Sequence, residues 1–366
     1  MKDIGLYIHI PFCASKCPYC DFYSLRGDEA TRLKYAEAVI RELKAASERY
    51  SRTADTLYIG GGTPSVLGGE LLCNIIEAAK ENLVRSNAEI TVECNPHSLE
   101  NGIFEKLKGA GVNRISLGLQ SANENERKRL GRRADKAEIQ RVIAKIKEAG
   151  IDNISLDVML GIPEGSIDSL KSTLDFCISQ DITHISGYIL KIEENTPFKK
   201  LEATLNLPDD DTVGDMYLFM CSYLKENGFS QYEISNFSKK GFESKHNLKY
   251  WNCDEYLGIG AAAHSFMDGM RFYYPRSAES FISGCASIDD GNGGNFEEYA
   301  MLRLRLTEGL KQADVTEKYG FPLPNRMRSK ADEYQKLGLV VSDSEGIRLT
   351  EKGFLVSNTV ISELIY

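Results

Sequence analysis

Three cysteines near the start of the chain, Cys13, Cys17 and Cys20, have the spacing of an iron-binding loop. Their C-x3-C-x2-C arrangement supplies three thiolates, which can ligate three irons of a [4Fe–4S] cluster. The fourth iron then has no protein ligand and can take a small molecule. A zinc site would need four ligands, usually from two C-x2-C pairs, and the sequence has no second pair. A plain redox thiol pair remains the other interpretation of this spacing.

The residues before the cysteines form a predicted strand. The segment 6–10 alternates apolar and polar residues, and Pro11 ends it. The three thiolates therefore lie on a loop that begins at the carboxyl end of a strand.

This context resembles the radical S-adenosylmethionine (SAM) superfamily. The sequence Tyr-Ile-His-Ile-Pro-Phe-Cys at 7–13, followed by Cys-Pro-Tyr-Cys-Asp-Phe at 17–22, is similar to one group within it. That group contains the oxygen-independent coproporphyrinogen III oxidases and their heme-chaperone relatives, the HemW proteins. The resemblance extends over most of the chain, and it implies that the amine and carboxylate of SAM bind the open iron.

The composition is that of a soluble globular protein. The 366 residues are 42% hydrophobic and 27% charged, enough chain for one large and one small domain. The net charge of −9 gives no electrostatic footprint for nucleic acid. The other cysteines are scattered singly, which argues against a disulfide framework and for a reducing compartment. Because neither a secretory signal nor a long apolar run is visible, we expect a cytoplasmic protein.

Strand-like and helix-like segments alternate through the first half of the chain. Helical patterns are clearest at 29–50 and at 135–149, which ends at Gly150. The predicted strands are 4–10, 54–60, 88–94, 112–119, 153–159 and 183–190. Six βα units in series predict a parallel α/β sheet, either an open barrel or a doubly wound sheet. The resemblance favours the incomplete (β/α)6 barrel of radical SAM enzymes.

Three domains are predicted along the chain. Residues 1–207 form the radical SAM barrel, and 208–290 form a barrel extension that holds a heme-binding motif. A turn-rich segment at 289–294 precedes a smaller α+β domain at 291–366. Its order of two helices, a hairpin with its tip at 343–346 and a closing helix resembles a winged helix. Basic and acidic residues nearly balance there, so we expect a docking or lid domain and no nucleic-acid binding.

Ligands of a barrel of parallel strands sit at the carboxyl ends of the strands. The second predicted strand ends in the glycine run 60–62 and Thr63, where backbone amides can approach a ligand closely or simply form a turn. The third ends at Glu93, whose carboxylate suits the amino group or ribose of SAM, or caps a helix. Cys94 is expected to be a packed thiol and not a fourth cluster ligand.

The next two strand ends carry polar side chains as well. Gln120 offers both a donor and an acceptor for a nucleoside or a carboxylate. Asp157 could hold ribose hydroxyls, since a core-facing carboxylate without a partner is costly to bury. Arg132 lies in a basic run that otherwise has the pattern of a solvated helix face, and it alone matches the SAM-contacting arginine of the oxidase group.

Two tyrosines match family positions. The resemblance places Tyr7 near SAM beside the open iron and Tyr19 near the adenine, although aromatic packing explains either equally well. His9 is expected to be a packed histidine at the end of its strand. The full set of residues that the resemblance assigns to SAM is Tyr7, Tyr19, Gly61, Gly62, Thr63, Glu93, Gln120, Arg132 and Asp157.

Two functions from different classes fit this scaffold. The first is an enzyme that decarboxylates two propionates of coproporphyrinogen III, and the second is a carrier of heme. Phe22 stands where the oxidases have a further cysteine, which implies that the oxidase activity is absent. The cluster motif begins at Cys13, whereas the oxidases carry a longer N-terminal extension. The run 246–251 matches the His-Asn-x-x-Tyr-Trp motif of the heme chaperones, and 256–265 is also typical of them.

The heme-chaperone motif contains a candidate axial ligand for heme iron. Imidazole is a common ligand of this kind, so His246 is the first candidate, although a single histidine often lies in a core or on a surface. Tyr250 and Trp251 offer flat apolar faces for a macrocycle. His264 is an alternative ligand in Gly- and Ala-rich surroundings typical of tight packing, and Cys253 ranks last.

The heme-carrier interpretation leads. It predicts a chaperone that binds a [4Fe–4S] cluster, SAM and heme, with heme docking apart from SAM near His246. The resemblance implies heme-acceptor proteins as partners, membrane-bound respiratory enzymes among them, and a homodimer promoted by the cluster. The oxygen-independent coproporphyrinogen III oxidase of porphyrin biosynthesis is the alternative.

Overall fold

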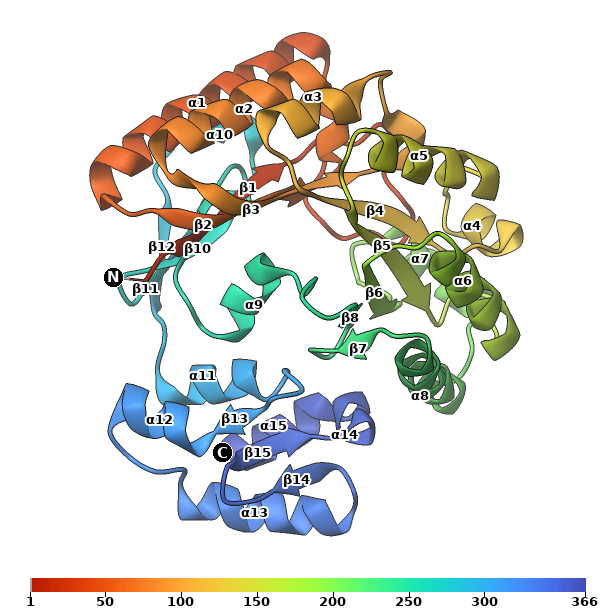
Figure 1. Cartoon of the computed structure of the whole chain (residues 1–366), viewed down its shortest axis with the longest axis vertical. Helices are drawn as coiled ribbons and strands as arrows, with labels where there is room; N and C mark the ends of the chain where they lie inside the picture. The colour runs from red at the N-terminus through yellow and green to blue at the C-terminus, as the bar shows by residue number, and fades with distance from the viewer. Residues whose placement is uncertain (1) are drawn as a thin grey trace.

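A parallel sheet covered by helices forms the larger part of the molecule (Figure 1). The computed structural model describes residues 2–366, with the side chain of Ser98 left out. The parallel strands are β1 (Ile4–Ile10), β2 (Ala54–Gly61), β3 (Val84–Cys94), β4 (Arg114–Gln120), β5 (Asn153–Leu160) and β6 (His184–Ile189). The helices between them are α1 (Glu29–Tyr50), α2 (Gly69–Asn82), α3 (Ile103–Ala110), α4 (Glu124–Arg129), α5 (Lys136–Glu148) and α6 (Ile167–Ser179).

The sheet does not close into a barrel. Its strand order is β12-β11-β10-β9-β1-β2-β3-β4-β5-β6-β8-β7, with two free edges. β9 (Tyr256–Ile259) pairs in parallel with β1, and β8 (Asn236–Ser238) pairs antiparallel with β6. The remaining strands are β7 (Ser230–Gln231), β10 (His264–Met267), β11 (Met270–Tyr273) and β12 (Ile288–Asn292). This open α/β barrel confirms the predicted fold class.

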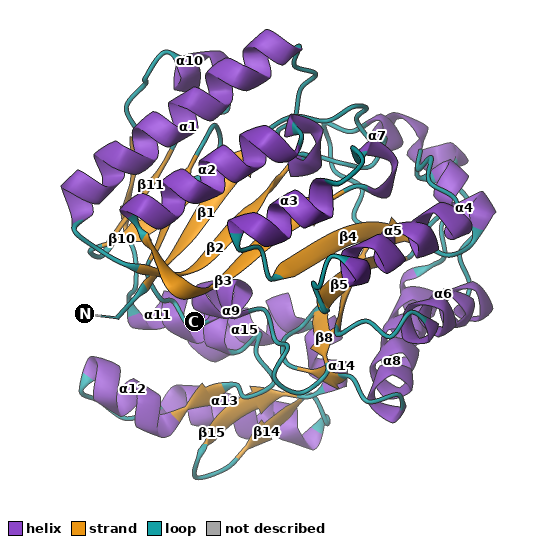
Figure 2. Cartoon of the chain, turned by 45° about the horizontal axis from the view of Figure 1, so that its top comes forward, coloured by secondary structure: helices purple, strands orange, loops and turns teal. Residues whose placement is uncertain are grey.

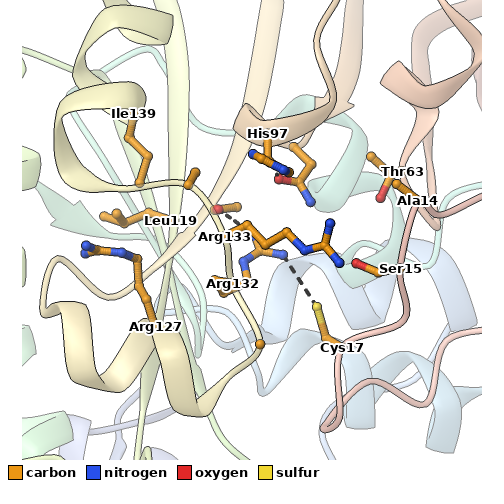
Figure 3. Close-up of a pocket in the computed structure, with 14 residues that line it drawn as sticks. Ala14, Ser15, Cys17, Thr63, His97, Leu119, Arg127, Arg132, Arg133 and Ile139 are labelled. Carbon is orange, nitrogen blue, oxygen red and sulfur yellow. Dashed lines mark hydrogen bonds between the residues drawn. The ribbon is translucent and has the colours of Figure 1, made fainter.

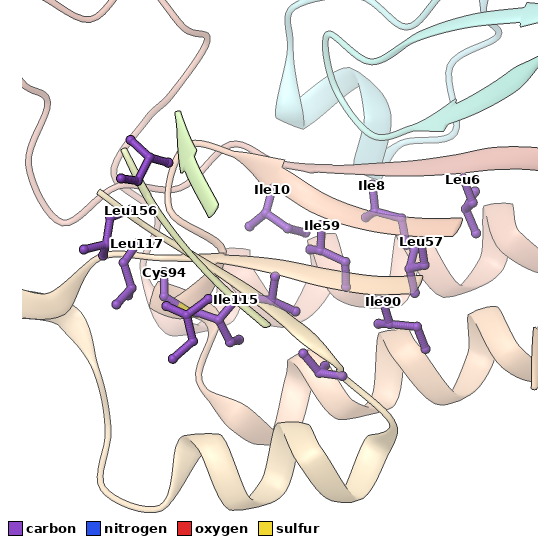
Figure 4. Close-up of a cluster of buried hydrophobic side chains, with 14 of the residues drawn as sticks. Leu6, Ile8, Ile10, Leu57, Ile59, Ile90, Cys94, Ile115, Leu117 and Leu156 are labelled. Carbon is purple, nitrogen blue, oxygen red and sulfur yellow. The ribbon is translucent and has the colours of Figure 1, made fainter. Parts of the chain in front are cut away.

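Alternation along the strands separates a core face from a cavity face. Leu6, Ile8 and Ile10 of β1 are fully buried and pack with Leu57 and Ile59 of β2 (Figure 4). Successive side chains of a strand point to opposite faces, so the residues between them turn inward. The helices α1, α2 and α3 lie side by side over the outer face (Figure 2).

Side-chain caps fix where the long helices begin. Asp28 accepts a hydrogen bond from the Thr31 amide at 2.8 Å at the start of α1. Asp135 accepts one from the Glu138 amide at the start of α5. Such caps contribute about 1 kcal/mol each, and the predicted helices 29–50 and 135–149 agree closely with α1 and α5.

The C-terminal third is smaller and built differently. A separate three-stranded sheet has the order β13-β15-β14. Its strands are β13 (Leu310–Lys311), β14 (Val340–Ser342) and β15 (Gly346–Leu349), and its helices are α11 (Phe296–Arg303), α12 (Gln312–Tyr319), α13 (Asn325–Lys336), α14 (Glu351–Leu355) and α15 (Ser357–Ile365). Three helices precede the hairpin where the sequence predicts two. The winged-helix-like α+β region is confirmed, while the domain boundaries stay predictions.

Three further helices fall between β6 and the C-terminal region in the sequence. They are α7 (Pro197–Leu201), α8 (Asp210–Glu226) and α10 (Ala278–Ile282). A fourth, α9 (Lys245–Trp251), lies between the parallel sheet and the C-terminal region (Figure 1). The segment 289–294, expected to be a turn, instead contributes most of the edge strand β12. Among the helices described, none is long and apolar enough to cross a membrane.

Candidate functional site

The loop that follows β1 carries all three cysteines of the C-x3-C-x2-C motif. Its two ends are held together, since the Cys13 amide donates to the Leu25 carbonyl at 3.0 Å and the Leu25 amide donates to the Pro11 carbonyl at 2.8 Å. The thiols of Cys13, Cys17 and Cys20 are free and half-buried. They are therefore accessible from the cavity and unpaired with one another.

The end of β2 packs tightly against this loop. The Thr63 amide donates to the Phe12 carbonyl at 2.8 Å, and the Thr63 hydroxyl lies 3.4 Å from the Cys13 sulfur. A Cβ on Gly62 would come within 2.7 Å of the Phe12 oxygen and 3.1 Å of the Cys13 sulfur. Gly61 adopts a φ of 117°, in the region that favours glycine. The glycine run is thus required by close approach to the cysteine loop.

Arg132, in the segment between α4 and α5, reaches the same loop. Its guanidinium Nη1 donates to the Cys17 sulfur at 3.8 Å, and Nη2 donates to the Gly118 carbonyl (Figure 3). A Cβ on Gly118 would lie 2.2 Å from Nη2, so a larger residue at this position would displace the end of the arginine side chain. This contact distinguishes Arg132 from the other arginines of its basic run.

Glu93, near the end of β3, presents a carboxylate to the interior of the open barrel. The Tyr58 hydroxyl donates to Oε1 at 2.8 Å, and the Gly61 amide donates to Oε2 at 3.1 Å. Burial raises the pKa of Glu93 to about 7. A bound cation at this position would stabilise the ionised form.

Asp157 and Gln120 stand at the next two strand ends. The Ser116 hydroxyl donates to Oδ1 of Asp157 at 3.3 Å, and burial raises the pKa of Asp157 to about 6. Gln120 has a left-handed backbone with a φ of 68°, at an irregularity in the pairing of β4 with β5. Strained backbone of this kind is concentrated at ligand sites.

Tyr7 lies on β1, and Tyr19 lies within the cysteine loop itself. The Tyr7 hydroxyl lies 2.9 Å from Nδ1 of His9, whose Nε2 lies 3.3 Å from the Tyr23 carbonyl oxygen. His9 is buried with both ring nitrogens bonded, as expected for a packed histidine. The ring of Tyr19 packs beside Phe198 of α7, with 6.2 Å between centroids.

One cavity of about 920 Å³ brings these groups together. Its walls include every residue predicted for the cluster and for SAM: Tyr7, Cys13, Cys17, Tyr19, Cys20, Gly61, Gly62, Thr63, Glu93, Gln120, Arg132 and Asp157. Pockets for single small molecules typically measure roughly 300–1,000 Å³. The cavity is therefore large enough for SAM with further volume beside it.

His246 does not line this cavity. Its side chain is 1% exposed, with Nδ1 at 2.8 Å from the Thr56 hydroxyl and Nε2 at 2.9 Å from the Tyr250 hydroxyl. Burial lowers the pKa of His246 to about 3, so the ring is neutral. Both ring nitrogens are thus within hydrogen-bond distance of a hydroxyl. Of the His-Asn-x-x-Tyr-Trp motif, it is Tyr250 that lines the cavity.

The other residues weighed for heme or cluster binding lie in different surroundings. His264 is exposed and lines the cavity, whereas the sequence suggested tight packing. Cys253 is buried outside the cavity wall. Cys94 packs in the hydrophobic core beneath the sheet, as predicted (Figure 4). Phe22 is 70% exposed at the edge of the cavity.

The donor set fits an iron–sulfur cluster. The described residues contain no group of three or more histidine, cysteine or acidic side chains gathered around one metal position. A [4Fe–4S] cluster takes one thiolate per iron, so its cysteines need not converge on a single point. Three free thiols on one cavity wall, beside the space that Gly62 leaves open, suit that geometry.

Several cavity residues carry no motif in the sequence. Gly118 leaves room for the Arg132 guanidinium, the Tyr23 carbonyl holds His9, and Tyr273 stacks on His264. The irregular pairing near Gly118 and the chain reversal that brings β9 to β1 are long-range features. Neither feature can be predicted from local sequence patterns.

The open barrel and its cysteine loop define a protein of the radical SAM class. A family model described as "Radical SAM superfamily" matches residues 7–177, and one described as "HemN C-terminal domain" matches 296–356. Membership of this superfamily implies a [4Fe–4S] cluster and SAM as cofactors.

Relatives define the family more narrowly. A protein of Lactococcus lactis named heme chaperone HemW is 32% identical, over 100% of this chain and 98% of its own length. Its namesake from Escherichia coli is 34% identical, over 99% of this chain and 98% of its own length. The chain belongs to the HemW family.

A solved structure shares the fold over nearly the whole chain. The coproporphyrinogen III oxidase HemN of Escherichia coli, described as a radical SAM enzyme, superimposes with a TM-score of 0.85. The match covers 99% of this chain and 90% of that one at 19% sequence identity. At that identity the similarity shows the fold.

Proposed function

We propose that this protein is a heme chaperone that holds a [4Fe–4S] cluster, binds SAM and passes heme to acceptor proteins. The observation that supports it most directly is the single cavity. It joins the cluster cysteines and the polar strand ends to an aromatic wall containing Tyr250, from the heme-chaperone motif. The relatives named heme chaperone HemW support the same function.

The cysteines and their neighbours hold the cluster. Cys13, Cys17 and Cys20 each supply one thiolate, and the Thr63 hydroxyl beside Cys13 can donate to its sulfur. Arg132 donates to the sulfur of Cys17 and offsets its negative charge. When bound, the cluster supplies an open iron for SAM and a one-electron carrier.

The strand ends orient SAM. The Glu93 carboxylate accepts from the amino group, while the glycine run at 60–62 gives backbone access on one side. Gln120 and Asp157 would hold the nucleoside part, because amide and carboxylate groups can bind ribose hydroxyls. Tyr7 and Tyr19, which also line the cavity, would help to exclude water.

Heme is the cargo in this proposal. The acceptors we propose are heme proteins, membrane-bound respiratory enzymes among them, and we propose a homodimer that depends on the cluster. An acidic chain with a net charge of −9 suits a protein partner better than a nucleic acid.

An anaerobic heme titration of the cluster-reconstituted protein tests the function. We expect a stoichiometric Soret shift and subsequent transfer of heme to an apo-respiratory enzyme. Heme binding no tighter than to an unrelated protein would overturn the carrier function.

The oxidase remains the alternative because its fold is shared. Coproporphyrinogen III incubated with the reconstituted protein, SAM and a reductant separates the two functions. We expect no decarboxylated product, since Phe22 replaces the additional cysteine of the oxidases.

A further inference from the structure

One histidine of the chain has an imidazole without a polar partner. His9, His184 and His246 are buried with both ring nitrogens within hydrogen-bond distance of a partner. His97 forms an ion pair with Glu138 at 3.5 Å. For His264, the part of the chain that the structure describes provides neither a hydrogen bond nor an ion pair.

The loop that precedes His264 is fixed by backbone contacts with the end of β1. A Cβ on Gly260 would lie 2.5 Å from the His9 carbonyl oxygen, so the β9–β10 loop packs against the end of β1. The buried Tyr35 hydroxyl donates to that oxygen at 2.9 Å and accepts from the Ala261 amide at 2.8 Å. Ala262 then turns the chain with a φ of 65°.

Flat apolar surface surrounds the free imidazole. His264 stacks on Tyr273 with 5.0 Å between ring centroids and 23° between planes, which fixes the orientation of the ring. Tyr250 and Tyr256, which line the same cavity, meet edge to face at 4.6 Å between ring centroids, and Tyr256 lies on the strand that pairs with β10. Aromatic side chains offer large rigid contact area to a planar ligand.

A cationic side chain also lines the cavity. Arg276 lines the cavity and donates from Nη2 to the Asp21 carbonyl at 3.1 Å, and it has no ion pair with any residue described. Its remaining donors are available to a carboxylate, which a guanidinium binds with good geometry.

We propose that His264 is the axial ligand of heme in this cavity and that Arg276 receives a propionate. The assignment rests on the proposed function and moves the ligand from His246 to the neighbouring strand pair. His246 then has a supporting role, because its hydrogen bond to Tyr250 orients the aromatic wall. Heme and SAM share one cavity in this arrangement.

Spectroscopic titration of the cluster-reconstituted full chain tests the ligand. We expect His264→Gly to weaken heme binding at least about tenfold and to lose the imidazole-ligated Soret band. Added imidazole should restore the band, since it fills the space that the substitution opens. His97→Gly, which removes an exposed histidine elsewhere, should bind heme as the unaltered protein does. Iron and sulfide content, measured on every variant, checks that the scaffold is intact.

Heme dimethyl ester tests the arginine. It lacks the two carboxylates, so Arg276→Gln should weaken the binding of heme and leave that of the ester unchanged. Equal effects on both ligands would overturn the propionate contact.

The outcomes separate the two proposals. No heme binding by the unaltered protein overturns the proposed function. Heme binding that survives His264→Gly with an unchanged spectrum, and is lost in His246→Gln, overturns the ligand assignment while the function stands. Loss in His264→Gly with rescue by imidazole supports both.

Discussion

Gly62 lies so close to Cys13 that a Cβ at Gly62 would stand 3.1 Å from the cysteine sulfur and 2.7 Å from the Phe12 carbonyl oxygen. The end of β2 and the cysteine loop are therefore fitted to each other at backbone level. Any side chain at this glycine must displace the loop that carries the thiolates.

Gly62→Ala should lower the iron and sulfide bound after reconstitution, because the loop shifts away from β2. The matched control is Gly109→Ala in α3, where a Cβ meets nothing within 4 Å. That control should keep full cluster content and gain up to about 1 kcal/mol of helix stability. Equal cluster content in both variants would contradict the close-fit argument.

Cys17→Ala should abolish an intact cluster, since the remaining two thiolates leave a second iron without a protein ligand. Cys94→Ala is the comparison, because Cys94 packs in the core and lies outside the C-x3-C-x2-C motif. We expect it to retain the cluster at a modest cost in stability. Normal iron and sulfide in Cys17→Ala would remove Cys17 from the cluster site.

Glu93→Gln should change stability in a pH-dependent way. The folded protein has a Glu93 pKa near 7, raised from an ordinary value of 4.5. Below about pH 4.5 the carboxyl is protonated in both the folded and the unfolded state. Its raised pKa therefore does not lower the free energy of unfolding there. As the pH rises through 7, the folded protein must ionise a buried group, and the free energy of unfolding falls.

The variant lacks that penalty. Its free energy of unfolding, relative to the unaltered apo-protein, should rise by about 2 kcal/mol between pH 5 and pH 8. Denaturant unfolding at several pH values measures this difference, and SAM affinity at pH 8 should fall in the same variant. A difference in stability that does not vary with pH would show that Glu93 ionises as freely as a surface carboxylate.

Tyr35→Phe should destabilise the protein by about 1–3 kcal/mol. The substitution leaves the His9 carbonyl and the Ala261 amide without their shared buried partner. Because that hydroxyl anchors the β9–β10 loop, heme affinity should fall as well, while cluster content stays normal. Tyr366→Phe, which removes the hydroxyl of a side chain that is 71% exposed, is the control. Unchanged stability of Tyr35→Phe would show that the bridge contributes little.

Local sequence patterns were sufficient to predict the parallel strands and the cavity residues assigned to the cluster and to SAM. Alternation and βα order predicted the strands that became β1 to β6, and their carboxyl ends form one wall. This worked because most of the predicted residues lie in the carboxyl half of a strand or just after it, and parallel strands end on the same side. Cys94 was likewise predicted correctly as a packed thiol.

Tertiary contacts decided the rest. His246 and His264 both lie in motifs typical of heme chaperones, and sequence reasoning ranked the buried one first. Its burial depends on Thr56 of β2, which is distant in the chain. The segment 289–294 looks like a turn because glycine and aspartate dominate it, yet pairing with β11 makes most of it an edge strand. Such pairing overrides local propensity.

The strand that carries the cysteine loop receives its second neighbour very late in synthesis. β2 follows β1 closely along the chain, but β9, which completes the other side of β1, ends at Ile259. Until the ribosome has made that residue, one edge of β1 is unpaired and open to association with other chains. Cluster insertion into a finished site is therefore a late event in the life of a nascent chain. A product truncated before β9 would display its three thiols on an unprotected edge.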